Sequence, residues 1–216
     1  MAMRVAFLSL LIVLTVDLPL GLAQDAAREL SANAQNECDL GRRVAERSVR
    51  LAHFEKGEAL AEKAVAQNDQ LADAHFALFC NIGEQMRIDG ESITSLRHYK
   101  RMMRALDRTL ELDPNHLGAM SSKGTFLVRL PMLMGGDAEK GEQMLRTVVQ
   151  RDPKAVNARL ALAKIYASRG RQQEALTLAM EALDNAKAEQ RTDMIPEAQA
   201  TIATLRGKNG TISASP

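Results

Sequence analysis

The chain has 216 residues, with 28 Lys and Arg against 27 Asp and Glu, a formal net charge of +1. This length suits one domain with a sizeable core. The near-neutral charge and an aromatic content of 3% argue against nucleic-acid binding. Good helix formers dominate, while β-branched and aromatic residues are few, so we expect an all-α protein.

Residues 1–23 have the pattern of a cleavable secretory signal peptide. Arg4 precedes the apolar run Val5–Val16, and residues 21–23 (Gly-Leu-Ala) form a small-x-small cleavage site. The alternative is an uncleaved anchor, but the apolar run falls short of the roughly 20 residues that a membrane span needs, and Asp17 interrupts it. We therefore expect a periplasmic or secreted protein with no stable membrane span after cleavage.

Residues 24–37 are rich in Ala and Gln, and we expect a frayed or helical lead-in there. A first helical repeat is predicted over residues 38–71, with Phe54 and Gly57 at the join between its two helices. Export would permit a disulfide between Cys38 and Cys80. In this register, however, Cys38 begins one helix and Cys80 lies more than two turns into the next equivalent helix. That offset exceeds the roughly 7 Å between Cα atoms that a disulfide tolerates, so we expect two unpaired cysteines.

A second repeat is predicted over residues 72–116, with a turn at Asp89-Gly90 and then a helix from about Ser92 to Leu112. Asp113-Pro114 ends this helix, because the residue before proline avoids the α region. The helix carries an apolar stripe at Leu96, Tyr99, Met103, Leu106 and Leu110. A basic stripe opposite it consists of Arg97, Arg101, Arg104 and Arg108. This stripe could face an acidic partner or anionic lipid, but we expect an ordinary solvated face.

A third repeat, over residues 117–155, contains an apolar insertion, Leu130–Met134, before Gly135-Gly136-Asp137. We expect Asp137 to cap the following helix. The insertion could form an adaptable contact patch. We expect it to cover the core instead, because exposed apolar patches are unusual on monomers.

A fourth repeat, over residues 156–189, contains two amphipathic helices that turn at Gly170. Its small residues Ala163, Ala175 and Ala182 are placed for close helix contact. Residues 190–207 are predicted to form a capping helix, with Pro196 near its start and Gly207 past its end. Residues 208–216 form a polar tail that we expect to be disordered.

The spacing of the fourth repeat resembles the tetratricopeptide (TPR) repeat family, on Leu162, Ala163, Tyr166, Gly170, Ala175 and Ala182. The resemblance implies an all-α, right-handed α-solenoid of about four helical hairpins with a C-terminal capping helix. Leu130-Pro131 followed by Gly135-Gly136-Asp137 is similar to the periplasmic T-component group associated with TRAP-type transporters. That similarity implies pairing with a periplasmic solute-binding protein.

Packing of the TPR type would place the first helix of each hairpin along a concave groove. The predicted groove residues are Arg42, Glu46, Asp73, Phe76, Cys80, Ser121, Thr125, Asn157, Leu160 and Lys164. Such a mixed surface suits an extended peptide or a helix of a partner protein. The alternative is that these are merely solvated positions.

Sites for chemistry are not apparent. His53, His75, His98 and His116 are scattered, and no metal-binding or nucleophile motif occurs. We predict no catalytic, cofactor or metal site, and a non-enzymatic exported scaffold for protein–protein interaction. The alternative function is a TRAP-associated component that handles a small ligand with a solute-binding protein. That function predicts an enclosed pore rather than an open groove.

Overall fold

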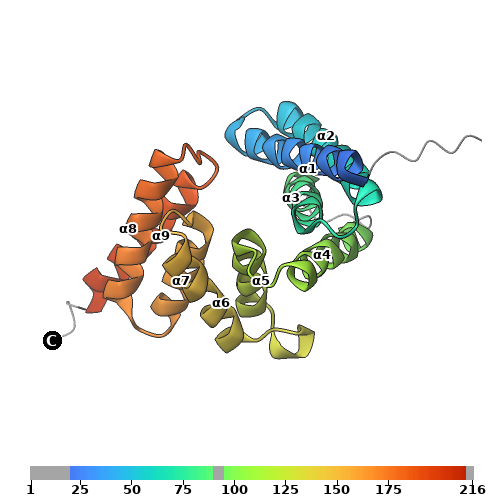
Figure 1. Ribbon diagram of the computed structural model, residues 1–216. Helices are drawn as coiled ribbons and strands as arrows, with labels where there is room; N and C mark the ends of the chain where they lie inside the picture. Colours follow the sequence, from blue (N-terminus) through green and yellow to red (C-terminus); the bar gives the residue numbers. More distant parts are fainter. Residues whose placement is uncertain (1–19, 90–94, 213–216) are drawn as a thin grey trace, which may run out of the picture.

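The computed structural model describes residues 20–89 and 95–212, and every regular element in these ranges is a helix (Figure 1). The first two hairpins are α1 (Leu20–Arg43) with α2 (Arg47–Gln67), and α3 (Ala72–Asp89) with α4 (Ser95–Leu112). The third is α5 (Leu117–Arg129) with α6 (Ala138–Arg151), joined through the short 3-10 helix η1 (Met132–Met134). The fourth is α7 (Val156–Ser168) with α8 (Gln172–Ala188), and α9 (Ile195–Ile212) packs against α8. The predicted all-α solenoid is confirmed.

The hairpins follow one another around an arch (Figure 1). One arm is formed by α1–α4 and the other by α7–α9, while α5 and α6 lie between them. The turn between α8 and α9 reaches the end of α1, where the Thr192 hydroxyl donates to the Arg43 carbonyl oxygen at 3.4 Å. The two ends of the solenoid therefore touch.

Local sequence signals explain where several helices begin and end. The carboxylate of Asp137 accepts a hydrogen bond from the Lys140 amide at 2.9 Å, which confirms it as the N-cap of α6. At the two Asp-Pro steps, Asp113 and Asp152 accept bonds from backbone amides two residues ahead, at 2.9 and 2.8 Å. These side-chain turns, together with proline, close α4 and α6.

The α7–α8 hairpin has the packing that the TPR resemblance implied. Ala163, Ala175 and Ala182 are fully buried between helices. Gly170 adopts a φ of 78°, the left-handed conformation that favours glycine at a helix end. The ring of Tyr166 is buried in the same core.

The predicted register of the first hairpin is wrong. Helix α1 begins well before Cys38, and the turn to α2 lies at residues 44–46. Glu46 caps α2 there, because its carboxylate accepts hydrogen bonds from the Ser48 and Val49 amides. Phe54 and Gly57 therefore lie within α2 rather than at a join. Phe54 is fully buried and its ring contacts the position where Gly41 would carry a Cβ atom.

The expectation of unpaired cysteines is wrong for the same reason. Cys38 lies near the end of α1 and faces Cys80 in the middle of α3, with their Cα atoms 6.3 Å apart, and the two form a disulfide. This bond joins the first hairpin to the second.

The apolar insertion does not cover the core, contrary to expectation. Met132, Leu133 and Met134 are 87%, 101% and 69% exposed. The Gly136 amide donates to the Pro131 carbonyl and the Asp137 amide to the Leu127 carbonyl, at 3.0 and 2.9 Å. These bonds turn the chain back on itself within a few residues, which leaves the three side chains outside.

Half of the arginine stripe on α4 is not merely solvated. Arg101 pairs with Glu58 and Glu62 of α2, and Arg108 pairs with Asp69 at 3.3 Å. These ion pairs tie α4 to the preceding helix and its turn. Arg97 and Arg104 are exposed, as expected.

Several sequence predictions lie outside the described residues. These are most of the signal peptide (1–19), the glycine of the Asp89-Gly90 turn, and the last part of the tail (213–216). The described part of the tail continues α9 to Ile212, beyond the predicted helix end. Within residues 20–89 and 95–212, none of the helices has the length and apolar character that crossing a membrane requires.

Removing the disulfide should destabilise the fold measurably. The bond closes a loop of 42 residues, for which the chain-entropy relation gives about 4 kcal/mol. We expect Cys38→Ser/Cys80→Ser to lose a free energy of unfolding of this order in urea titrations. Reductant should destabilise the wild type equally and leave the variant unchanged. Equal unfolding curves for the oxidised and reduced wild type would contradict the structure.

Candidate partner-binding cleft

The inside of the arch is hollowed into a cleft of about 680 Å³. Its walls come from α1, α3, α5, α7 and α9, with further side chains from α4 and the first turn of α6. The first helix of each hairpin thus faces the same space. A surface assembled from several hairpins in this way is typical of solenoid proteins.

The structure places the ten predicted groove residues in three locations. Seven line the cleft: Arg42, Cys80, Ser121, Thr125, Asn157, Leu160 and Lys164. Asp73 and Phe76 line a separate hollow of about 440 Å³, between α1, α3 and the start of α5. Glu46 lies at neither hollow and serves as the N-cap of α2.

Two of the seven cleft residues are buried in the wall of the cleft and offer little surface for contact with a ligand. Cys80 is buried in its disulfide with Cys38. Leu160 packs into a cluster with Met194 and Ala198. The other five are left as candidate contacts: the polar residues Ser121, Thr125 and Asn157, the exposed Lys164, and Arg42, which is paired with Glu84.

The apolar part of the cleft was missed by the sequence prediction. It includes Phe79, Met86, Tyr99, Phe126 and Ile165. The rings of Phe79 and Phe126 meet edge to face, with centroids 6.5 Å apart, and so connect α3 with α5. Tyr99 comes from α4, a second helix, which a rule restricted to first helices could not find.

Charged residues surround this apolar surface, and most of them are held by partners. The Lys164 ammonium group lies 2.5 Å from a Glu197 carboxylate oxygen of α9. Arg169 pairs with the largely buried Glu142. The exposed Arg129 has no ion pair among the described residues.

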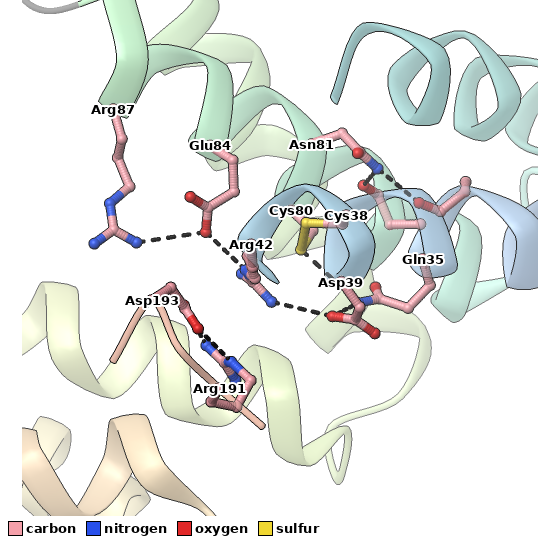
Figure 2. A network of polar contacts seen from close by, with 12 residues as sticks. Gln35, Cys38, Asp39, Arg42, Cys80, Asn81, Glu84, Arg87, Arg191 and Asp193 are labelled. Atoms are coloured by element: carbon pink, nitrogen blue, oxygen red, sulfur yellow. Dashed lines mark hydrogen bonds and ion pairs between the residues drawn. A yellow bond between two sulfur atoms is a disulfide. The ribbon is translucent and has the colours of Figure 1, made fainter. Parts of the chain in front are cut away.

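The two ends of the arch meet beside Arg42, Glu84 and Arg87 of the cleft lining, a place that we call the mouth. Three arginines and three carboxylates lie there in two neighbouring groups that we together name the clasp: Asp39, Arg42, Glu84, Arg87, Arg191 and Asp193 (Figure 2). The Arg42 guanidinium bridges Glu84 at 2.8 Å and Asp39 at 3.4 Å. Arg191 and Asp193, in the α8–α9 turn, pair through two hydrogen bonds of 2.9 Å. Figure 2 shows this second pair beside Arg42 and Asp39.

The electrostatics of Arg191 connect the two halves of the clasp. Its burial disfavours the charged form, but Asp193, and then Asp39 and Glu84, outweigh this and raise the pKa of the guanidinium. The turn that carries Arg191 depends on Gln190 in a left-handed conformation, with a φ of 54°. The Arg191 amide then donates to the Ala186 carbonyl at 2.8 Å, which fixes the direction of the turn.

The second hollow contains a polar pair between hairpins. His116, the N-cap of α5, lies 3.2 Å from the carboxylate of Asp73 on α3. The hydrogen bond from His116 lowers the pKa of Asp73, and it outweighs the opposing effect of desolvation. The Phe76 ring packs on His116 with centroids 4.4 Å apart. Asp73 and Phe76 therefore contribute to packing between α3 and α5.

Within the described residues, no group of three or more His, Cys, Asp or Glu side chains is placed to hold a metal ion. The cleft offers apolar surface, hydroxyl and amide groups, and oriented charges. These groups suit noncovalent binding of a polypeptide segment or a small molecule.

No protein-family model matches the sequence, and no curated protein matches it. Among solved structures, the chain is similar to MamA (41-end) from Desulfovibrio magneticus RS-1, with a TM-score of 0.43 and 16% identity over 81% of this chain and 96% of that chain. It is also similar to YrrB, described as a TPR protein with an unusual peptide-binding site, with a TM-score of 0.34 and 17% identity over 81% and 95%. Yeast Tom70 gives a TM-score of 0.42 and 18% identity over 91% of this chain and 45% of that chain. Likenesses at this level concern the helical fold and not what the chain binds.

Loss of the clasp should loosen both ends of the arch. Arg191→Ala leaves the largely buried Asp193 without its partner, and we expect a loss of about 2 kcal/mol in the free energy of unfolding. Amide hydrogen exchange should rise at residues 189–194 and also at the α1–α2 turn. Arg28→Ala, which breaks an exposed ion pair with Asp25 on α1, is the matched control. Faster exchange confined to residues 189–194 would contradict contact across the mouth.

Proposed function

We propose that this protein is an exported scaffold that binds a segment of a partner protein reversibly in the cleft. The observation that carries the proposal is the composition of the cleft, in which an apolar surface is surrounded by polar and charged side chains from successive hairpins. Such a surface can exclude water from apolar side chains of a bound segment while the polar groups set its direction. Thr125 of α5 and Lys164 of α7 both line this cleft.

Export is supported by two independent observations. The sequence begins with a signal-peptide pattern, and Cys38 and Cys80 form a disulfide, a bond that persists mainly in oxidising compartments. Cleavage after Ala23 would leave Gln24 as the first residue.

A second candidate function is favoured by the contact across the mouth. The TRAP-associated alternative predicts an enclosed space, and the Thr192–Arg43 bond joins the two ends of the arch. If the ends of the arch enclose the cleft, the ligand would be a small molecule passed to or from a solute-binding protein. Calorimetric titration of purified candidate solutes would support this function if binding required an intact cleft. Binding of peptides but not solutes would count against it.

Filling the cleft should abolish binding of a partner segment. Peptides selected from a random displayed library on the wild-type protein should lose at least tenfold in affinity for Thr125→Trp. Thr177→Trp is the matched control, because both hydroxyls bond the carbonyl four residues earlier, while Thr177 lies on the outside of α8. Selected peptides that bind both variants as tightly as the wild type would place the binding surface elsewhere.

Export and oxidation can be tested together on the protein purified from its own cell envelope. Intact mass spectrometry should give the mass of residues 24–216, lower by the two hydrogens of one disulfide. Peptide mapping should then join Cys38 to Cys80. A mass that retains residues 1–23, or free thiols in the mature protein, would contradict the proposal.

A further inference from the structure

The first helices of successive hairpins end in arginines that line the cleft. Arg87 lies in the last turn of α3, Arg129 ends α5, and Arg169 is the C-cap residue of α7. All three belong to the lining of the cleft. We call these three residues the arginine row.

The arginine row also places cations at helix ends, where they interact favourably with the helix dipole. Basic residues at the ends of second helices, Arg151 of α6 and Lys187 of α8, lie outside the cleft lining. The arginine row differs from them because its three members line one cleft.

Carboxylates behind the row leave guanidinium donors available. The Glu84 carboxylate, largely buried, contacts one terminal nitrogen of Arg87 at 3.4 Å, while the Arg87 side chain is 62% exposed. Glu142, also largely buried, holds one terminal nitrogen of Arg169, whose side chain is 44% exposed. A guanidinium has five N–H donors, so each of these arginines can still bind an anion while its orientation is fixed. Arg129 has no ion pair among the described residues and offers all of its donors.

Apolar side chains accompany the arginines in the cleft. Met86, Phe126 and Ile165 line the same cleft and come from the same three helices. A surface that combines cationic and apolar groups matches a ligand that carries both anionic and apolar groups. A nucleic acid or a simple polyanion offers no aliphatic side chains for this surface.

From this charge complementarity we propose that the occupant of the cleft is an extended acidic segment of a partner protein, whose carboxylates pair with Arg87, Arg129 and Arg169. The proposal rests on the proposed function and adds the chemistry of the partner. An extended segment that crosses α3, α5 and α7 in order passes the three arginines in turn. The segment therefore carries several acidic residues, with apolar residues between them.

The test compares three labelled, acetylated nine-residue peptides by fluorescence anisotropy. The acidic peptide repeats Glu-Leu-Ser three times, the neutral peptide has Gln in place of each Glu, and the basic peptide has Lys. We expect the acidic peptide to bind the full mature protein at least tenfold more tightly than the neutral one. This preference should weaken between 50 and 200 mM NaCl, because rim charges are screened.

Two triple variants assign the preference to the arginine row. Arg87→Gln/Arg129→Gln/Arg169→Gln should bind the acidic and neutral peptides equally. Arg97→Gln/Arg104→Gln/Arg206→Gln removes the same charge from exposed positions outside the cleft lining and should keep the preference. A preference that survives in the first variant, or disappears in the second, would overturn the proposal. Arg42 is left intact because it joins Glu84 to Asp39 in the clasp, whereas Arg87, the other clasp arginine on this side, contacts only Glu84, at 3.4 Å.

Other outcomes separate this proposal from the proposed function. Tighter binding of the neutral or basic peptide, abolished by Thr125→Trp, would reject the acidic partner and keep the scaffold. Heparin or a ten-nucleotide DNA that displaces the labelled acidic peptide as readily as unlabelled acidic peptide does would reject it in favour of a general polyanion surface. Failure of all three peptides to bind at millimolar concentration would also reject it. The library selection on Thr125→Trp would still decide the scaffold.

Discussion

The attachment of α1 to α3 determines the shape of the molecule. Beside the Cys38–Cys80 disulfide, the Asn81 amide group donates to the Ala34 carbonyl at 3.0 Å. A Cβ atom on Gly57 would lie 2.1 Å from Asn81 Oδ1, so glycine is what allows α2 to approach this buried amide. With α1 fixed in this way, Arg42 reaches Glu84, and the end of α1 stands at the mouth of the cleft opposite the α8–α9 turn. The arch therefore depends on interactions at its first hairpin.

This arrangement explains how a short solenoid can build a defined binding surface. Each hairpin contributes only a few side chains to the cleft, and the fixed order of hairpins sets their spacing. Buried carboxylates such as Glu84 and Glu142 orient guanidinium groups before any partner arrives, which lowers the ordering cost of binding. The clasp also affects how a long segment would enter the cleft. Either the ends of the arch separate, or the segment enters from the open faces. A balanced network of three arginines and three carboxylates can be opened without leaving an excess of either charge.

The sequence predicted this architecture where local signals were strong. The α7–α8 hairpin carries small residues at contact positions and Gly170 at its turn, and the structure has the same packing there. The first hairpin has no glycine or proline at its turn, and the Glu46 cap is a weaker sequence signal than the Phe54–Gly57 pair. The turn was therefore predicted too late in the sequence. In that incorrect register Cys38 and Cys80 lay too far apart for a disulfide. The Leu130–Met134 insertion was predicted to cover the core because it is apolar. Backbone hydrogen bonds from the Gly136 and Asp137 amides, rather than hydropathy, determine that its side chains lie outside. Periodicity identified residues on first helices that face the cleft. Tyr99 lines the cleft from α4, and the Arg191–Asp193 pair lies beside Arg42, and only the assembled fold shows these two arrangements.

The central claim is that the ends of the solenoid meet around one cleft. Pulsed electron paramagnetic resonance tests it with spin labels on cysteines introduced at Ala45, in the α1–α2 turn, and Ala188, at the end of α8, both exposed. The native cysteines are bonded to each other and do not take up label. The account predicts one narrow, short distance distribution that lengthens and broadens in the Arg191→Ala background. A broad, long distribution that is the same in both backgrounds would contradict a closed arch.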